Sequence, residues 1–116
     1  MWYQNYSAQK LINHFIDVLL KFSLFDQALI LTREYSLKLE HKIGFRNYET
    51  CKAKERLIDQ LVKQNQMEEA LAQARFYSLT LEHNVGYNNQ YTCKAIGIFI
   101  DLLMKLDRNE EALSVA

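Results

Sequence analysis

The sequence contains no proline and only three glycines among its 116 residues. Because these two residue types most often interrupt helices and form turns, their scarcity excludes a loop-rich fold and favours helices joined by short turns. No apolar run approaches the ~20 residues that a membrane-spanning helix needs. The first ten residues are polar and aromatic and do not resemble a signal peptide. We therefore expect a cytoplasmic protein that does not bind a membrane, with residues 1–116 forming one domain.

The chain also lacks the residue patterns of several functional classes. Two cysteines, Cys51 and Cys93, are too few for a disulfide framework. Fourteen basic residues balance fourteen acidic ones, which argues against a surface for nucleic acid. There is no Ser/His/Asp set, no glycine-rich phosphate loop and no zinc signature. We expect neither an enzyme nor a bound cofactor.

The dominant feature that is present is an internal repeat with a period of 42 residues. Residues 33–74 and 75–116 are identical at 22 of 42 positions without a gap, and a more divergent copy occupies residues 1–32. In each copy, two stretches carry apolar residues every three or four positions, which is the pattern of amphipathic helices. The sequence predicts helices over residues 5–22, 24–42, 47–64, 66–83, 89–106 and 108–116. We therefore expect an all-α fold of about three antiparallel helix-turn-helix units, at about 1–32, 33–74 and 75–116.

Polar residues and glycines predict where these helices begin and end. Gly44 and Gly86 are placed to end the second helix of a unit, and Asn47 and Asn89 to cap the helix that follows. The second helices are expected to begin with a capping box, in which a polar residue precedes an acidic one by three positions. These pairs are Asn65–Glu68, Asp107–Glu110 and the weaker Ser23–Asp26.

The copies resemble the tetratricopeptide repeat. The resemblance lies in the Glu-Glu-Ala-Leu sequences at 68–71 and 110–113, where Ala70 and Ala112, with Ala28 in the first copy, match the small residue at a helix crossing. The 42-residue period is similar to the extended subclass of that family. The chain departs from the family in having Leu57-Ile58 in place of a Leu-Gly pair and in lacking a proline at the end of the unit. The resemblance implies an α-solenoid that winds as a right-handed superhelix with a concave binding groove.

This groove makes a scaffold that binds a protein or peptide the leading functional hypothesis. The alternative is a regulatory or sensor domain of a larger signalling protein or transcription regulator that responds to a peptide. The last predicted helix is cut short, so we expect the chain to be part of a longer array. Apolar residues at the open ends, Trp2, Tyr3 and Leu113 among them, also predict a homo-oligomer.

A ladder of charges on the first helix of each unit is the candidate binding surface. Lysine, aspartate and lysine recur at the same three positions of every copy, and by resemblance this helix face lines the groove. The ladder would orient an extended ligand, or else only stabilise the helices through Asp-to-Lys pairs four residues apart, worth ~0.2–0.5 kcal/mol each. Asn13 and Glu55 occupy one neighbouring groove position in two copies. With them, the candidate partner-binding residues are Lys10, Asn13, Asp17, Lys21, Lys52, Glu55, Asp59, Lys63, Lys94, Asp101 and Lys105.

Other recurring residues are interpreted as structural. His41 and His83 are expected in the last turns of helices, where they complement the negative helix end better than they would bind a metal. Cys51 and Cys93 are expected to be small buried residues. Most of the recurring aromatic residues are expected to be buried between units; they include Tyr35, Tyr77, Phe45 and Tyr87.

Overall fold

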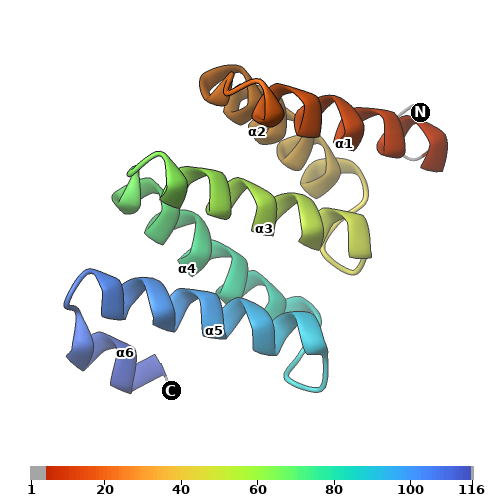
Figure 1. Cartoon of the computed structure of the whole chain (residues 1–116). Coiled ribbons are helices and arrows are strands. Elements are labelled where there is room, and N and C mark those ends of the chain that lie inside the picture. Colours follow the sequence, from red (N-terminus) through yellow and green to blue (C-terminus); the bar gives the residue numbers. More distant parts are fainter. Residues whose placement is uncertain (1–4, 116) are drawn as a thin grey trace. The chain divides into compact units, whose positions relative to one another are not determined.

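The computed structural model describes residues 5–115, and this part of the chain is helical, with six helices and no strand (Figure 1). The predicted all-α class is confirmed. Trp2 and Tyr3 lie outside the described residues. The helices are α1 (Tyr6–Lys21), α2 (Phe25–Lys42), α3 (Tyr48–Lys63), α4 (Met67–Asn84), α5 (Gln90–Lys105) and α6 (Asn109–Val115).

The helix bounds repeat with the period of the sequence. Helices α1, α3 and α5 begin at residues 6, 48 and 90 and end at residues 21, 63 and 105, so each bound recurs after 42 residues. Every predicted bound lies within one residue of the observed one. The pattern of apolar residues therefore placed the helices correctly, because local amphipathicity and turn residues determine where a helix stops.

By their internal contacts, the residues form two compact units, residues 1–60 and 61–116. The first contains α1, α2 and most of α3. The second contains the last turn of α3, followed by α4, α5 and α6. In the second unit α5 packs against both α4 and α6, and in the first α1 packs against α2.

Asparagine caps the first helix of each copy, as predicted for Asn47 and Asn89. The Oδ1 atom of Asn47 accepts a hydrogen bond from the backbone N–H of Glu49 at 2.8 Å, and that of Asn89 accepts from Tyr91 at 2.7 Å. Asn5 caps α1 in the same way, with the N–H of Ser7 at 2.8 Å. Gly44 and Gly86 end α2 and α4 with φ angles of 86° and 92°, which confirms the predicted stop signal.

The predicted capping boxes are wrong. Ser23, Asn65 and Asp107 adopt left-handed backbone conformations, with φ angles of 61°, 60° and 58°, and end the preceding helix instead of beginning the next. The residue after each one donates its backbone N–H to a carbonyl five residues earlier, the bond that defines a Schellman motif. These bonds are Leu24 to Leu19 at 2.9 Å, Gln66 to Leu61 at 2.8 Å and Arg108 to Leu103 at 2.8 Å. A residue in the left-handed conformation cannot also take the extended conformation of an N-cap. Because these three residues end one helix, they cannot form the capping box of the next.

The core of the first unit is built by three helices. Ile16 of α1, Tyr35 and Leu39 of α2 and Ala53 of α3 form one buried cluster. Each of the crossing alanines is buried, as predicted from the resemblance: Ala28, Ala70 and Ala112.

Two predicted burials are wrong: that of Tyr87, in the turn before α5, and that of Cys93, in the first turn of α5. Phe45 and Cys51 are buried at the start of α3, whereas the equivalent Tyr87 and Cys93 are exposed at the start of α5. Burial of a side chain depends on the helices that pack around it and not on the local sequence alone. The same local sequence therefore has a different environment in the two copies.

Candidate functional site

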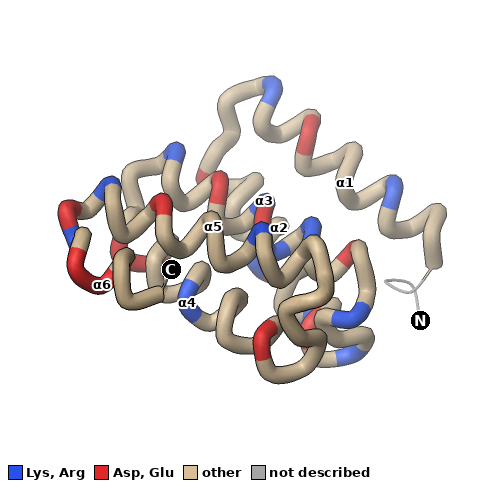
Figure 2. The backbone as a smooth tube through the Cα atoms, turned by 90° about the horizontal axis from the view of Figure 1, so that it is seen from below, with Lys and Arg blue, Asp and Glu red and all other residues tan. Residues whose placement is uncertain are grey.

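The charge ladder lies on solvent-exposed faces of three helices. Figure 2 shows basic and acidic segments alternating along α1. Asn13 and Glu55, the two neighbouring candidates, are half-buried. All nine ladder residues are exposed: Lys10, Asp17 and Lys21 on α1, Lys52, Asp59 and Lys63 on α3, and Lys94, Asp101 and Lys105 on α5.

Four of the candidate residues meet in one pocket of the first unit. The pocket lies between α1 and α3 and has a volume of about 450 Å³. Lys10, Asn13 and Asp17 reach it from α1, and Lys52 reaches it from α3. Its other lining residues are Tyr6, Gln9, Tyr48, Glu49 and Arg56. We call these nine residues the α1–α3 pocket.

Hydrogen bonds fix the base of the α1–α3 pocket. The Oε2 atom of Glu49 accepts from the side-chain amide of Asn13 at 2.6 Å and from the hydroxyl of Tyr35 at 2.7 Å. Burial of Tyr35 raises the pKa of its hydroxyl, and the carboxylate of Glu49 raises that pKa further. The hydroxyl therefore stays protonated and keeps Glu49 in place as a hydrogen-bond acceptor.

Arg56 connects this base to the charge ladder. Its guanidinium donates to the Oδ1 atom of Asn13 at 3.2 Å and forms an ion pair with the carboxylate of Asp17. The carboxylate of Asp17 in α1 is thus paired with a residue of α3. The pair expected from the sequence was with Lys21, four residues further along α1. The arrangement orders the pocket in the absence of a ligand.

Two exposed tyrosines and two exposed lysines complete the α1–α3 pocket. Tyr6 and Tyr48 occupy the same repeat position on α1 and α3, as do Lys10 and Lys52. The ammonium of Lys52 lies 5.0 Å from the centre of the Tyr48 ring, within the range of a cation–π contact. The pocket thus presents flat aromatic surface and exposed cations together.

Sequence reasoning missed Glu49 and Arg56, which organise this pocket. The equivalents of Glu49 in the other copies are Ser7 and Tyr91, and those of Arg56 are His14 and Ile98. The charge ladder consists of residues that recur every 42 positions, and these two do not recur. The signal that was available is their spacing of seven residues on one helix, which places them on the same face of α3.

The remaining candidates do not line the α1–α3 pocket. Lys21 lies at the end of α1, and the others lie along α3 and α5: Glu55, Asp59, Lys63, Lys94, Asp101 and Lys105. His41 and His83 are exposed in the last turns of α2 and α4. Among residues 5–115, no group of three or more His, Cys, Asp or Glu side chains is arranged to hold a metal ion.

No helix in the described part of the chain is both long enough and apolar enough to cross a membrane. Comparisons of the sequence with protein-family models and with curated proteins, and of the chain with solved structures, gave no match.

Proposed function

We propose that this chain is a peptide-binding scaffold domain and that the α1–α3 pocket holds an extended segment of another protein. The observation that carries the proposal is the meeting of Lys10, Asn13, Asp17 and Lys52 around an ordered polar base. The repeat pattern of the sequence predicts these same four residues as candidates for binding. In this proposal the helical pairs form a tetratricopeptide-like solenoid and act in the cytoplasm without catalysis.

The chemistry of the α1–α3 pocket suits an acidic peptide. The lysine ammonium groups donate hydrogen bonds to carboxylates and to backbone carbonyls of a ligand. The rings of Tyr6 and Tyr48 offer large contact areas at a low cost in conformational entropy. Because Asp17 pairs with Arg56 and Glu49 accepts hydrogen bonds from Asn13 and Tyr35, the two exposed lysines leave positive charge on the surface of the pocket. Since the base is ordered before binding, the ligand does not have to organise it.

A selection from a random peptide library tests the proposal. The full chain is immobilised, displayed peptides are enriched, and the dissociation constants of the selected peptides are measured by calorimetry. We expect acidic peptides whose affinity falls at least about tenfold in the Lys10→Glu/Lys52→Glu variant, which corresponds to about 1.4 kcal/mol.

A variant of equal net charge provides the control. In Lys21→Glu/Lys105→Glu the substituted lysines are also exposed on first helices but lie outside the pocket. We expect its affinity to stay within about twofold of the original. Selected peptides that respond equally to both double variants, or a library that yields no saturable binder, would show that the pocket is not a peptide site.

A further inference from the structure

A second surface of α1 carries apolar side chains that its repeat equivalents bury. Leu11 and Phe15 are 67% and 55% exposed. At the same repeat positions, Ala53 and Leu57 of α3 are 3% and 1% exposed, and Ala95 and Phe99 of α5 are 0% and 4% exposed. With Ala8, one turn before Leu11, these side chains lie on one face of α1. We call Ala8, Leu11 and Phe15 the α1 stripe.

In each of the two compact units, the structure shows which helix packs against the residues of α3 or α5 that are equivalent to the α1 stripe. In the first unit, Ala53 clusters with Tyr35 and Leu39 of α2. In the second, α4 packs on α5, and the guanidinium of Arg75 lies 4.9 Å from the centre of the Phe99 ring. In both cases the cover includes the second helix of the preceding pair; Ala53 also shares its buried cluster with Ile16 of α1.

The two covering helices share one pattern of side chains. Arginine, tyrosine and leucine stand at positions i, i+2 and i+6, as Arg33, Tyr35 and Leu39 in α2 and as Arg75, Tyr77 and Leu81 in α4. The tyrosine and the leucine of each helix are buried. A helix that carries this pattern is therefore the kind of helix that packs against the equivalents of the α1 stripe.

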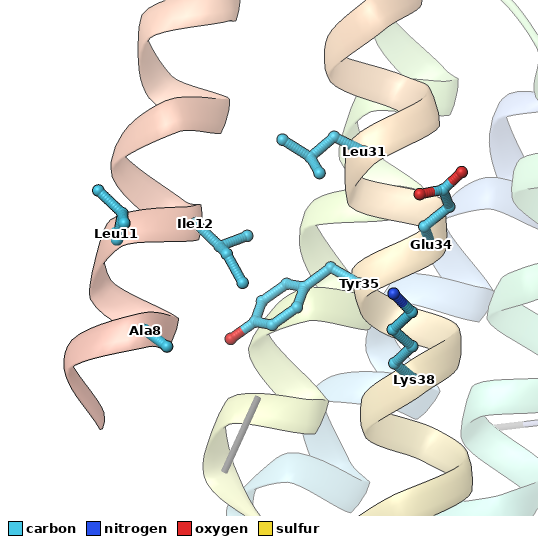
Figure 3. A pocket seen from close by; sticks show the side chains of 7 residues that line it. All are labelled: Ala8, Leu11, Ile12, Leu31, Glu34, Tyr35 and Lys38. Atoms are coloured by element: carbon cyan, nitrogen blue, oxygen red, sulfur yellow. The ribbon is translucent and has the colours of Figure 1, made fainter. Parts of the chain in front are cut away.

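Ala8 and Leu11 of the α1 stripe also line an apolar pocket between α1 and α2 (Figure 3). It has a volume of about 190 Å³, and Figure 3 shows Ile12 and Tyr35 facing each other between α1 and α2. Glu34 and Lys38 stand along α2 at its side, so that a charged edge borders an apolar centre. This combination is typical of a groove that takes one face of an amphipathic helix.

We propose that the α1 stripe docks an amphipathic helix of another polypeptide, which presents arginine, tyrosine and leucine at positions i, i+2 and i+6. The leucine and the tyrosine would cover Leu11, and the arginine would stack on Phe15 as Arg75 stacks on Phe99. A second copy of this chain is a poorer occupant. Its α2 and α4 already bury their tyrosine and leucine, so neither helix has these side chains available to cover Leu11.

A helical peptide with the sequence of α4 tests the proposal with a probe from the chain itself. The peptide spans residues 67–84 and is held helical by a lactam between Glu68 and Ala72→Lys, two positions that are exposed in α4. Circular dichroism verifies its helicity, and fluorescence anisotropy of the labelled peptide measures its binding to the full chain. We expect saturable binding that Leu11→Gln/Phe15→Gln in the chain weakens at least about tenfold.

Matched controls separate this site from general stickiness. Ile30→Gln removes an equally exposed apolar side chain from α2, at a position whose equivalents, Ala72 and Ser114, are exposed too. We expect this substitution to leave binding unchanged. In the peptide, Tyr77→Ser/Leu81→Ser should weaken binding at least about tenfold, and this arm does not depend on the folding of a variant chain.

Three outcomes would overturn the proposal. The first is the absence of binding by a peptide shown to be helical, and the second is binding that neither double variant weakens. The third is a dimer of the chain alone in sedimentation that Leu11→Gln/Phe15→Gln abolishes, because a second copy would then be the occupant. None of these experiments involves Lys10 or Lys52, so they can disprove docking on the α1 stripe without affecting the proposed function of the α1–α3 pocket.

Discussion

The ammonium of Lys54 lies 2.8 Å from the carboxylate of Glu40, and the two side chains are only 2% and 11% exposed. The same carboxylate oxygen accepts a hydrogen bond from the hydroxyl of Ser36 at 3.0 Å. In the other copies the position of Lys54 is held by Ile12 and Ile96. The junction between α2 and α3 thus contains a nearly buried ion pair for which those copies have no equivalent lysine.

We expect the loss of one partner of this pair to destabilise the fold strongly. Glu40→Ala removes the carboxylate that lies against the nearly buried ammonium of Lys54 and should lower the free energy of unfolding by about 3 kcal/mol. The double substitution Glu40→Leu/Lys54→Ile removes both charges and should restore most of that loss. Urea denaturation of the three proteins measures the effect. A single variant as stable as the original chain would show that water reaches the pair.

Ala70 should tolerate no larger side chain. It is fully buried in α4, so Ala70→Leu should overpack the helix contact and cost about 1–3 kcal/mol. Ala72→Leu, on the exposed face of the same helix, should change stability by less than about 0.5 kcal/mol. The midpoints of urea denaturation compare the two, and equal midpoints would mean that Ala70 does not lie at a close crossing.

Tyr35 should make the stability of the chain depend on alkaline pH. Burial first, and then Glu49, raise the pKa of its hydroxyl above the ordinary value of 10.0. The stabilisation from this group is therefore complete below about pH 10 and falls as the pH rises further, because the unfolded tyrosine ionises first. Tyr35→Phe should cost about 1 kcal/mol at neutral pH, through the lost hydrogen bond to Glu49, and should flatten the alkaline decline. Denaturation at a series of pH values measures both effects; curves that stay parallel would rule out this role.

At Ser23, a helix end and a helix start predict opposite changes in stability for the same substitution. Because Ser23 has a φ angle of 61°, Ser23→Gly should relieve strain and stabilise the chain by about 0.5–1 kcal/mol. Asn65→Gly should have a smaller effect, since asparagine tolerates this conformation better than serine does. Thermal unfolding of the variants provides the measurement. A loss of stability in Ser23→Gly would instead indicate that Ser23 acts as the N-cap of α2.

The sequence by itself determined where each helix begins and ends. The bounds depend on the spacing of apolar residues, on Asn47 and Asn89 as caps and on Gly44 and Gly86 as stops, and all of these act within one or two turns of the chain. The one local error, at turns such as Ser23, has a local cause. A polar residue between two helices is compatible with ending the first or starting the second, and only backbone hydrogen bonding decides between them.

The tertiary structure alone decided which side chains meet. Arg56 with Asp17, Tyr35 with Glu49 and Lys54 with Glu40 join helices whose sequences carry no mark of the contact. The identical Thr-Cys-Lys-Ala sequences at 50–53 and 92–95 contain a buried Cys51 and an exposed Cys93. Burial and charge pairing depend on the surrounding helices. The repeat therefore predicts every helix, but it does not predict which residues line the α1–α3 pocket, because helix packing decides that.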